Sequence, residues 1–160
     1  MITLSILGSD NLNDLQLLLE KGQDYFAFQE GKPVDATAGK KLFSFCPADC
    51  PLENKLVMGL YQKNLLIGVF ELFQHFPTDN VLNLGLLLID PAFRSQGLGS
   101  QAYRKLERWT LAHNMSLIKL GVLLPNTSAQ RFWESLGFRK TGEIKPYLHH
   151  QFYVLEKIIS

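Results

Sequence analysis

The stretch that decides the fold runs from Leu86 to Gly99 and reads Leu-Leu-Leu-Ile-Asp-Pro-Ala-Phe-Arg-Ser-Gln-Gly-Leu-Gly. The apolar residues up to Ile89 predict a strand, Asp90-Pro91 predicts a turn, and a glycine-bearing loop follows. Apolar residues then recur at helical spacing as far as His113, so a helix is expected to begin near Gly99. The first N–H groups of a helix have no intrahelical partner, and the helix dipole favours an anion. This order of elements therefore predicts a phosphate-binding loop.

A dinucleotide-binding fold is the main alternative for these glycines, because Gly97-Leu-Gly99-Ser-Gln-Ala102 also fits the pattern G-x-G-x-x-A. That fold places an acidic residue about twenty positions further on, where it binds a ribose hydroxyl. The corresponding residues here, 116–122, include no Asp or Glu. Three strands that are expected to be antiparallel also precede the loop, so the dinucleotide-binding interpretation is disfavoured.

Two motifs carry a resemblance to a known family. Asp90-Pro91-x-x-Arg94-x-x-Gly97-x-Gly99 resembles motif A of the GNAT superfamily of N-acetyltransferases, where (R/Q)-x-x-G-x-(G/A) binds the pyrophosphate of acetyl-CoA. The segment Asn126–Phe138 is similar to the superfamily pattern N-x-x-A-x-x-(hydrophobic)-(aromatic)-E-x-x-G-F. One expected helix and one expected strand separate the two motifs, which together cover roughly Leu82–Phe138. The resemblance implies an N-acetyltransferase with acetyl-CoA as cosubstrate.

The resemblance also implies which residues bind this cosubstrate. Backbone groups of the strand would bind the pantetheine arm, amides of the loop would bind the pyrophosphate, and the second motif would contribute a wall. Asn126 has an equally simple interpretation as a plain helix N-cap. The implied residues are Leu87 and Ile89 for the arm, Arg94, Ser95, Gln96, Gly97, Gly99 and Ser100 for the pyrophosphate, and Asn126 and Trp133 for the wall.

Trp133 departs from the pattern of many relatives, which carry a tyrosine whose hydroxyl can protonate the departing CoA thiolate. An indole N–H is far too weak an acid for that role. We therefore expect Trp133 to pack beside the cofactor while water or another group supplies the proton. The alternative is a catalytically weak domain that binds CoA or a partner without efficient transfer.

The strand Val81–Ile89 leads into the glycine loop, and the general base is expected on the strand that precedes it. An amine acceptor arrives protonated and must lose a proton before it attacks a thioester. Strand Val81–Ile89 contains no acid or histidine, whereas period-two alternation puts Glu71 and His75 on one face of Leu65–His75. Both are candidate catalytic residues. The competing interpretation of Glu71 is a half-exposed side chain, or one paired with a basic residue.

The whole pattern predicts one α/β domain over residues 1–160, with a mixed, largely antiparallel sheet of six or seven strands flanked by helices. The aromatic and polar residues 24–31 are assigned no regular element, and the cluster Asp24–Phe28 within them is a candidate wall of the acceptor site. Lys145–His150 is expected to be a loop. The expected strands are Ile2–Leu7, Leu56–Gln62, Leu65–His75, Val81–Ile89, Leu117–Leu124, Phe138–Ile144 and Gln151–Ile159, and the helices lie near residues 12–22, 36–45, 99–113 and 127–137.

Composition limits the classes of partner. The 160 residues are 46% hydrophobic and 19% charged with a formal net charge of +1, which is ordinary for a globular protein and gives no attraction to nucleic acid or to an anionic membrane. No signal peptide or membrane span is expected, so the cytoplasm is the expected compartment. Cys46 and Cys50 stand alone, so no metal site is expected. The expected partner is a small-molecule or peptide amine, and a homodimer is left open.

Overall fold

Seven strands form one sheet in the computed structural model, which describes all residues from Met1 to Ser160. Their order across the sheet is β1-β2-β3-β4-β5-β7-β6, and every neighbouring pair is antiparallel except the parallel pair β4 and β5. The expected mixed, largely antiparallel sheet is confirmed. The strands are β1 (Ile2–Ile6), β2 (Lys55–Gln62), β3 (Leu65–Gln74), β4 (Val81–Ile89), β5 (Leu117–Leu123), β6 (Arg139–Tyr147) and β7 (His150–Ile158).

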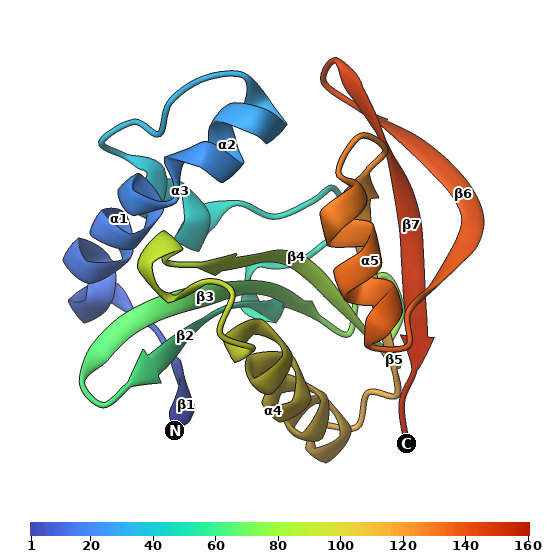
Figure 1. Cartoon of the computed structure of the whole chain (residues 1–160). Helices are drawn as coiled ribbons and strands as arrows, with labels where there is room; N and C mark the ends of the chain where they lie inside the picture. Colours follow the sequence, from blue (N-terminus) through green and yellow to red (C-terminus); the bar gives the residue numbers. More distant parts are fainter.

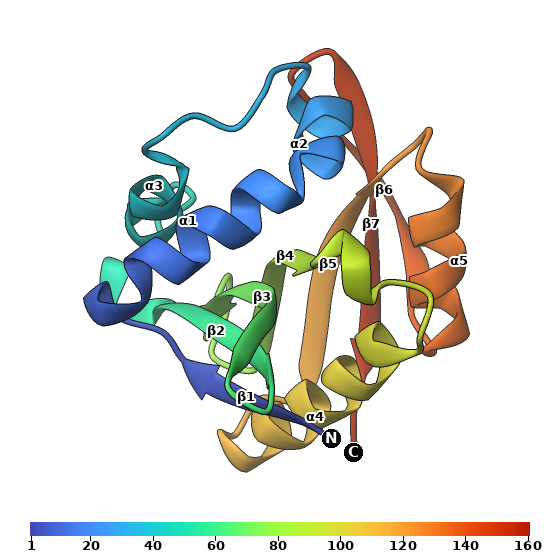
Figure 2. The same cartoon turned by 60° about the vertical axis from the view of Figure 1, so that its left-hand side comes forward.

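Helices cover both faces of this sheet (Figures 1 and 2). A core of 21 buried residues joins the sheet to α4 and α5, and a smaller core of 9 buried residues joins the other face to α1. None of the helices is both long enough and apolar enough to cross a lipid bilayer. The helices are α1 (Leu12–Lys21), α2 (Gln23–Glu30), α3 (Ala38–Ser44), α4 (Leu98–Ala112) and α5 (Thr127–Ser135), with single 3-10 turns at η1 (Ser9–Asn11), η2 (Leu52–Asn54) and η3 (Pro91–Phe93).

The two parallel strands at the centre of the sheet part half-way along their length. Pairing between β4 and β5 runs from Val81 opposite Leu117 to Leu84 opposite Leu120 and then ends. The next residue, Gly85, is an extra residue in the ladder with β3, which is a β-bulge. Leu82 and Leu84 before the bulge belong to the larger core, whereas Leu86 and Leu88 after it belong to the smaller one. The bulge therefore marks the point at which a cleft opens between the strands.

Three local expectations need correction. Residues 24–31, to which no regular element was assigned, belong to α2, which ends at Gly31 with a left-handed φ of +74°. The expected loop Lys145–His150 is the tip of a hairpin, because β6 continues to Tyr147 and β7 begins at His150. The helix expected near residues 127–137 ends at Ser135, and Asn126 is its N-cap, where the side chain accepts from the N–H of Ala129.

Candidate functional site

Two cavities meet at the bulge in β4. The larger, of about 780 Å³, lies between the parted ends of β4 and β5 and is bounded by the loop before α4, the start of α5 and α2. The smaller, of about 360 Å³, lies between the α2–α3 segment and strands β3 and β4. Four residues line both cavities: Tyr25, Gln29, Gly85 and Leu86. A ligand in one cavity is thus separated from a ligand in the other by only these side chains and the bulge.

Six consecutive amides in the loop before α4 have no partner in the protein, and all of their residues except Gln96 line the larger cavity. The N–H groups from Ser95 to Ser100 donate to no backbone or side-chain acceptor. Gly97, at the N-cap of the 15-residue helix α4, has φ +75°, and nothing lies within 4 Å of the position that a Cβ would take there. Unpartnered amides at a helix N-terminus, with open space in front of them, suit a phosphate group. The loop thus fits the pyrophosphate of acetyl-CoA.

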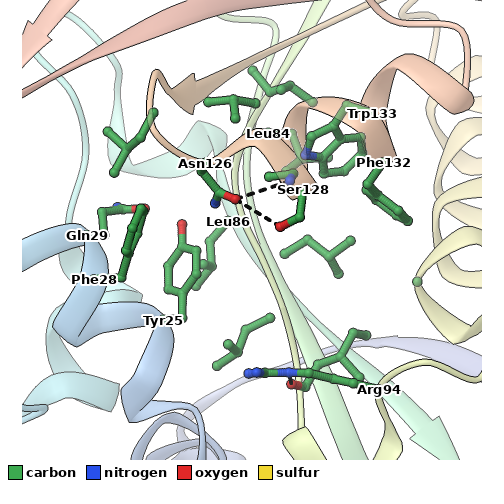
Figure 3. Close-up of a pocket in the computed structure, with 18 of the residues that line it drawn as sticks. Tyr25, Phe28, Gln29, Leu84, Leu86, Arg94, Asn126, Ser128, Phe132 and Trp133 are labelled. Atoms are coloured by element: carbon green, nitrogen blue, oxygen red, sulfur yellow. Dashed lines mark hydrogen bonds between the residues drawn. The ribbon is translucent and has the colours of Figure 1, made fainter.

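Arg94 connects this loop to α2. Its Nε donates to the carbonyl of Ile89 at 2.9 Å, and its guanidinium forms an ion pair with Asp24. The hydrogen bond from Arg94 holds the pKa of the Asp24 carboxyl below its usual value. The guanidinium lies on the wall of the larger cavity (Figure 3). Arg94 therefore adds positive charge beside the amides while it fixes the position of α2.

The open edge of β4 explains why two residues of this strand are suited to bind an extended ligand. The N–H of Asp90 donates to the carbonyl of Ile67, which fixes the alternation of the β3–β4 ladder. By that alternation, the backbone groups of Leu87 and Ile89 point away from β3 and toward the gap left by β5. Both residues line the larger cavity, and the Ile89 carbonyl is already taken by Arg94.

Helix α5 supplies the opposite wall of the larger cavity. Asn126 lies at its N-cap, where its side-chain oxygen accepts from the Ala129 N–H and the Ser128 hydroxyl (Figure 3). Trp133 is buried in an aromatic cluster with edge-on contacts to Tyr103 and Phe138. Trp133 is thus part of the core as well as of the cavity wall, and Asn126 caps a helix as well as lining the cavity.

Glu71 lies in the floor of the smaller cavity, in a buried ion pair that sequence reasoning left without a named partner. Its Oε2 accepts from the ammonium of Lys55 at 2.6 Å, and the Lys55 Nζ also donates to the carbonyl of Phe45 at 2.7 Å. Burial raises the pKa of the Glu71 carboxyl, and the charge of Lys55 opposes that rise. The side chains of Glu71 and Lys55 are only 11% and 3% exposed. Both the carboxyl and its cation are therefore held away from bulk water.

The second carboxyl oxygen of Glu71 remains free. Oε1 makes no hydrogen bond, and a Cβ placed on Gly85 would lie only 2.8 Å from it. Gly85 lines both cavities, whereas Glu71 lines only the smaller one, so the free oxygen lies next to their junction on the side of the smaller cavity. The arrangement leaves one acceptor atom of a buried carboxyl for a ligand that donates a proton or carries positive charge.

His75, the other candidate base, is not brought to the site. It follows the end of β3, at the end of the β3–β4 ladder remote from the parted strands, and it lines neither cavity. Its φ is +52°, and its Nδ1 is 2.6 Å from the carbonyl of Asp79 in an exposed turn. Strand β3 ends at Gln74, so His75 does not lie on the strand face that carries Val69, Glu71 and Phe73.

Tyr25 lies in the segment that was expected to form a wall of the acceptor site, whereas Gln29, which lines the cavities, and Lys55, which supports Glu71, escaped the sequence analysis. Tyr25 and Gln29 lie four positions apart on α2 and line both cavities. Burial raises the pKa of the Tyr25 hydroxyl, which stays protonated and points away from α2 into the larger cavity (Figure 3). The i, i+4 spacing of Tyr25 and Gln29, followed by Gly31, was the available signal for a helix there. The sequence contains no local pattern that identifies Lys55, 16 residues away, as the partner of Glu71.

Comparison with known proteins identifies the family of folds to which this geometry belongs. The sequence model described as "Acetyltransferase (GNAT) family" matches residues 17–138. N-acetylaspartate synthetase from Homo sapiens is 33% identical over 70 residues, which are 44% of this chain and 23% of that protein. The Danio rerio protein of the same name is 32% identical over 69 residues, which are 43% of this chain and 24% of that protein. The chain thus spans about a quarter of the length of these curated relatives.

Solved structures share the fold over almost the whole chain. The ribosomal-protein-S18-alanine N-acetyltransferase from Escherichia coli superposes with a TM-score of 0.75 at 20% identity, covering 100% of this chain and 95% of that one. An acetyltransferase from Thermus thermophilus gives a TM-score of 0.79 at 18% identity, covering 99% and 97%. At these identities the likeness is one of fold.

Proposed function

Because this chain belongs to the acetyltransferase (GNAT) family, we propose that it is an N-acetyltransferase that moves the acetyl group of acetyl-CoA to a primary amine. One observation carries the proposal. The cavity lined by the unpartnered amides meets, at Gly85 and Leu86, the cavity that holds the free oxygen of Glu71. Donor and acceptor can thus be bound separately and still react at one point.

The larger cavity is the proposed site of acetyl-CoA. In this proposal the amides of residues 95–100 bind the pyrophosphate, and Arg94 adds charge next to them. The backbone of Leu87 and the N–H of Ile89 bind the pantetheine arm at the open edge of β4. Trp133 and Asn126 close the opposite wall. Together these groups direct the thioester toward the bulge at Gly85.

Glu71 is the proposed general base at the junction. Its free Oε1 accepts a proton from the ammonium of the acceptor, and the neutral amine nitrogen then forms a bond to the acetyl carbonyl carbon while the carbon–sulfur bond breaks. A raised pKa makes the carboxylate a stronger base than an ordinary glutamate. Trp133 has no acidic proton to give, and burial makes the Tyr25 hydroxyl a weaker acid, so the second proton that the nitrogen loses as the amide forms passes through water to the CoA thiolate.

The names of the relatives do not define the acceptor. They refer to N-acetylaspartate and to an alanine of ribosomal protein S18, which are chemically different products and substrates. Those names do support an amino group as the site of acetylation. The acceptor of this chain has to be argued from the cavity next to Glu71.

Two measurements test the proposal. Titration calorimetry should detect binding of acetyl-CoA to the full chain, and release of free thiol from acetyl-CoA should depend on an added primary amine. Binding without amine-dependent thiol release would instead support a domain that binds CoA without transfer. This alternative follows from Trp133, which cannot donate a proton to the thiolate as a tyrosine could. Absence of acetyl-CoA binding would overturn both.

A further inference from the structure

The smaller cavity has an apolar wall. Nine of its 17 lining residues are hydrophobic, and they come from α1, α2, the segment after α2, α3 and the residue that follows it, β4 and the end of β6. Its volume of about 360 Å³ is at the lower end of the range for small-molecule pockets, about 300–1,000 Å³. The apolar side chains that line it include Phe26, Pro33, Val34, Leu42 and Phe45. Such a wall binds a compact apolar group.

Most of the charged groups around this cavity already have partners. Lys55 is engaged by Glu71 and by the carbonyl of Phe45. Asp35 forms an ion pair with Lys41 at 2.8 Å, and both side chains are exposed. The uncommitted groups are the free Oε1 of Glu71, the carboxylate of Glu30 and the exposed ammonium of Lys32. Of the charges of Glu30 and Lys32, that of Glu30 acts on the Glu71 carboxyl, so the uncommitted charge next to Glu71 is negative.

Resting on the proposed function, we infer that the acceptor is a small primary amine with a compact apolar body and no carboxylate next to its amino group. The ammonium binds the free oxygen of Glu71, and the apolar body lies against the wall formed by α2, α3 and the segment between them. A carboxylate on the carbon that bears the amine would lie near Glu71, on which the negative charge of Glu30 also acts, whereas the one uncommitted cation of the lining, Lys32, is an exposed side chain. Like charges brought together in such a partly buried site repel each other strongly.

A small molecule fits better than a protein terminus because α2 meets the β6–β7 hairpin beside the cleft. The ring of Phe28 stacks on that of His150 with centroids 6.2 Å apart and planes inclined by 16°. Tyr147 of the same hairpin lines the smaller cavity. A folded protein would have to displace this contact to present its terminus, whereas a small amine would not.

A matched set of amines tests the inference. Phenethylamine and phenylalanine differ only in the α-carboxylate, and ethylamine keeps the amino group without the apolar body. We expect kcat/KM from thiol release to be highest for phenethylamine and lower by about 10-fold or more for phenylalanine, because of charge repulsion. Ethylamine should show a KM higher by about 10-fold or more, because it buries little apolar surface. Aspartate, with two carboxylates, should be the poorest acceptor.

Two leucines provide matched variants for the wall. Leu42 on α3 and Leu111 on α4 are both half-buried, but only Leu42 lines the smaller cavity. Leu42→Ala should raise the KM for phenethylamine by about 5- to 10-fold, since it removes apolar contact with the ligand. Leu111→Ala makes the same truncation elsewhere and should leave this KM unchanged. Both variants should bind acetyl-CoA as the wild type does.

The outcomes separate the inference from the proposed function. Preference for phenethylamine over its carboxylated analogue, together with the effect of Leu42→Ala, supports the inference. If aspartate or phenylalanine is the better acceptor, or if no apolar amine reacts although acetyl-CoA binds, the inference is overturned and acetyl-CoA binding stands. If acetyl-CoA does not bind at all, the proposed function itself fails.

Discussion

Replacement of Gly97 by valine tests the anion site where it is most exposed to a ligand. Gly97 has φ +75° and ψ 8°, and nothing lies within 4 Å of the position of an added Cβ. Gly31 at the end of α2 has nearly the same backbone, φ +74° and ψ 13°, and equally open space. Gly31→Val therefore reproduces the backbone strain of Gly97→Val without placing a side chain in front of the six unpartnered amides.

The expected magnitude has two parts. A side chain in the left-handed conformation costs about 1–2 kcal/mol, so both variants should lose about that much free energy of unfolding. Only Gly97→Val also fills the space in front of the amides of residues 95–100. Loss of two hydrogen bonds to a charged phosphate, at about 1.5–3 kcal/mol each, predicts a decrease in acetyl-CoA affinity of about 10²- to 10⁴-fold.

Calorimetric titration with acetyl-CoA measures the affinity, and urea unfolding measures the stability of the same three proteins. We expect equal destabilisation of the two variants, loss of affinity in Gly97→Val and wild-type affinity in Gly31→Val. A folded Gly97→Val protein that binds acetyl-CoA as tightly as the wild type would show that the amides do not hold the pyrophosphate. Equal loss of affinity in both variants would mean that strain, not ligand contact, is responsible.

Three further variants address the chemistry. Glu71→Gln should lower kcat/KM by about 100-fold or more. Because burial raises the Glu71 pKa above its ordinary 4.5, wild-type kcat/KM should rise with pH through that raised value. This rise should vanish in Glu71→Gln and persist in the control variant His75→Gln. Lys55→Met removes the cation that opposes the raised pKa, so the same rise should move to higher pH, and the uncompensated carboxylate should cost about 3–5 kcal/mol of stability at neutral pH, measured by urea unfolding. Trp133→Phe should retain most of kcat while it lowers the free energy of unfolding by about 1–3 kcal/mol; a collapse of kcat at unchanged acetyl-CoA affinity would contradict a packing role.

The sheet was predictable because its strands have strong, local signals. Strand β4 has the predicted bounds, Val81–Ile89, and the hairpin and the strand after α4 differ from expectation by only one residue at an end. Helix α2 was missed because its eight residues show no apolar stripe and none of them is buried. It is held by contacts remote in sequence, such as the ion pair of Asp24 with Arg94. Local periodicity gives no information about contacts of that kind.

The Lys55–Glu71 ion pair was hidden by a single irregularity in the β2–β3 hairpin. Gln62 lies opposite Leu65, and an unbroken ladder from that turn would put Leu56 opposite Glu71, with Lys55 on the other face. A shift of one residue at Leu60/Tyr61 instead puts Val57 opposite Glu71. Lys55 then lies diagonally across from Glu71 on the same face, within reach of its carboxyl. Regular alternation of side chains along β2, without this shift, would place Lys55 and Glu71 on opposite faces of the sheet.

The bulge at Gly85 links the fold to the proposed chemistry. Pairing of β4 with β5 ends at Leu84, immediately before the bulge, so the same place in the chain opens the cleft for the cofactor. A Cβ on Gly85 would lie 2.8 Å from the free oxygen of Glu71 and 2.9 Å from the ring of Phe73, so a side chain there would displace the carboxyl or the ring. The missing side chain brings the β4 backbone, the carboxyl and both cavities together at one position. Glu71 on β3 can therefore serve a cleft formed by the next strand, which has no acid or histidine of its own.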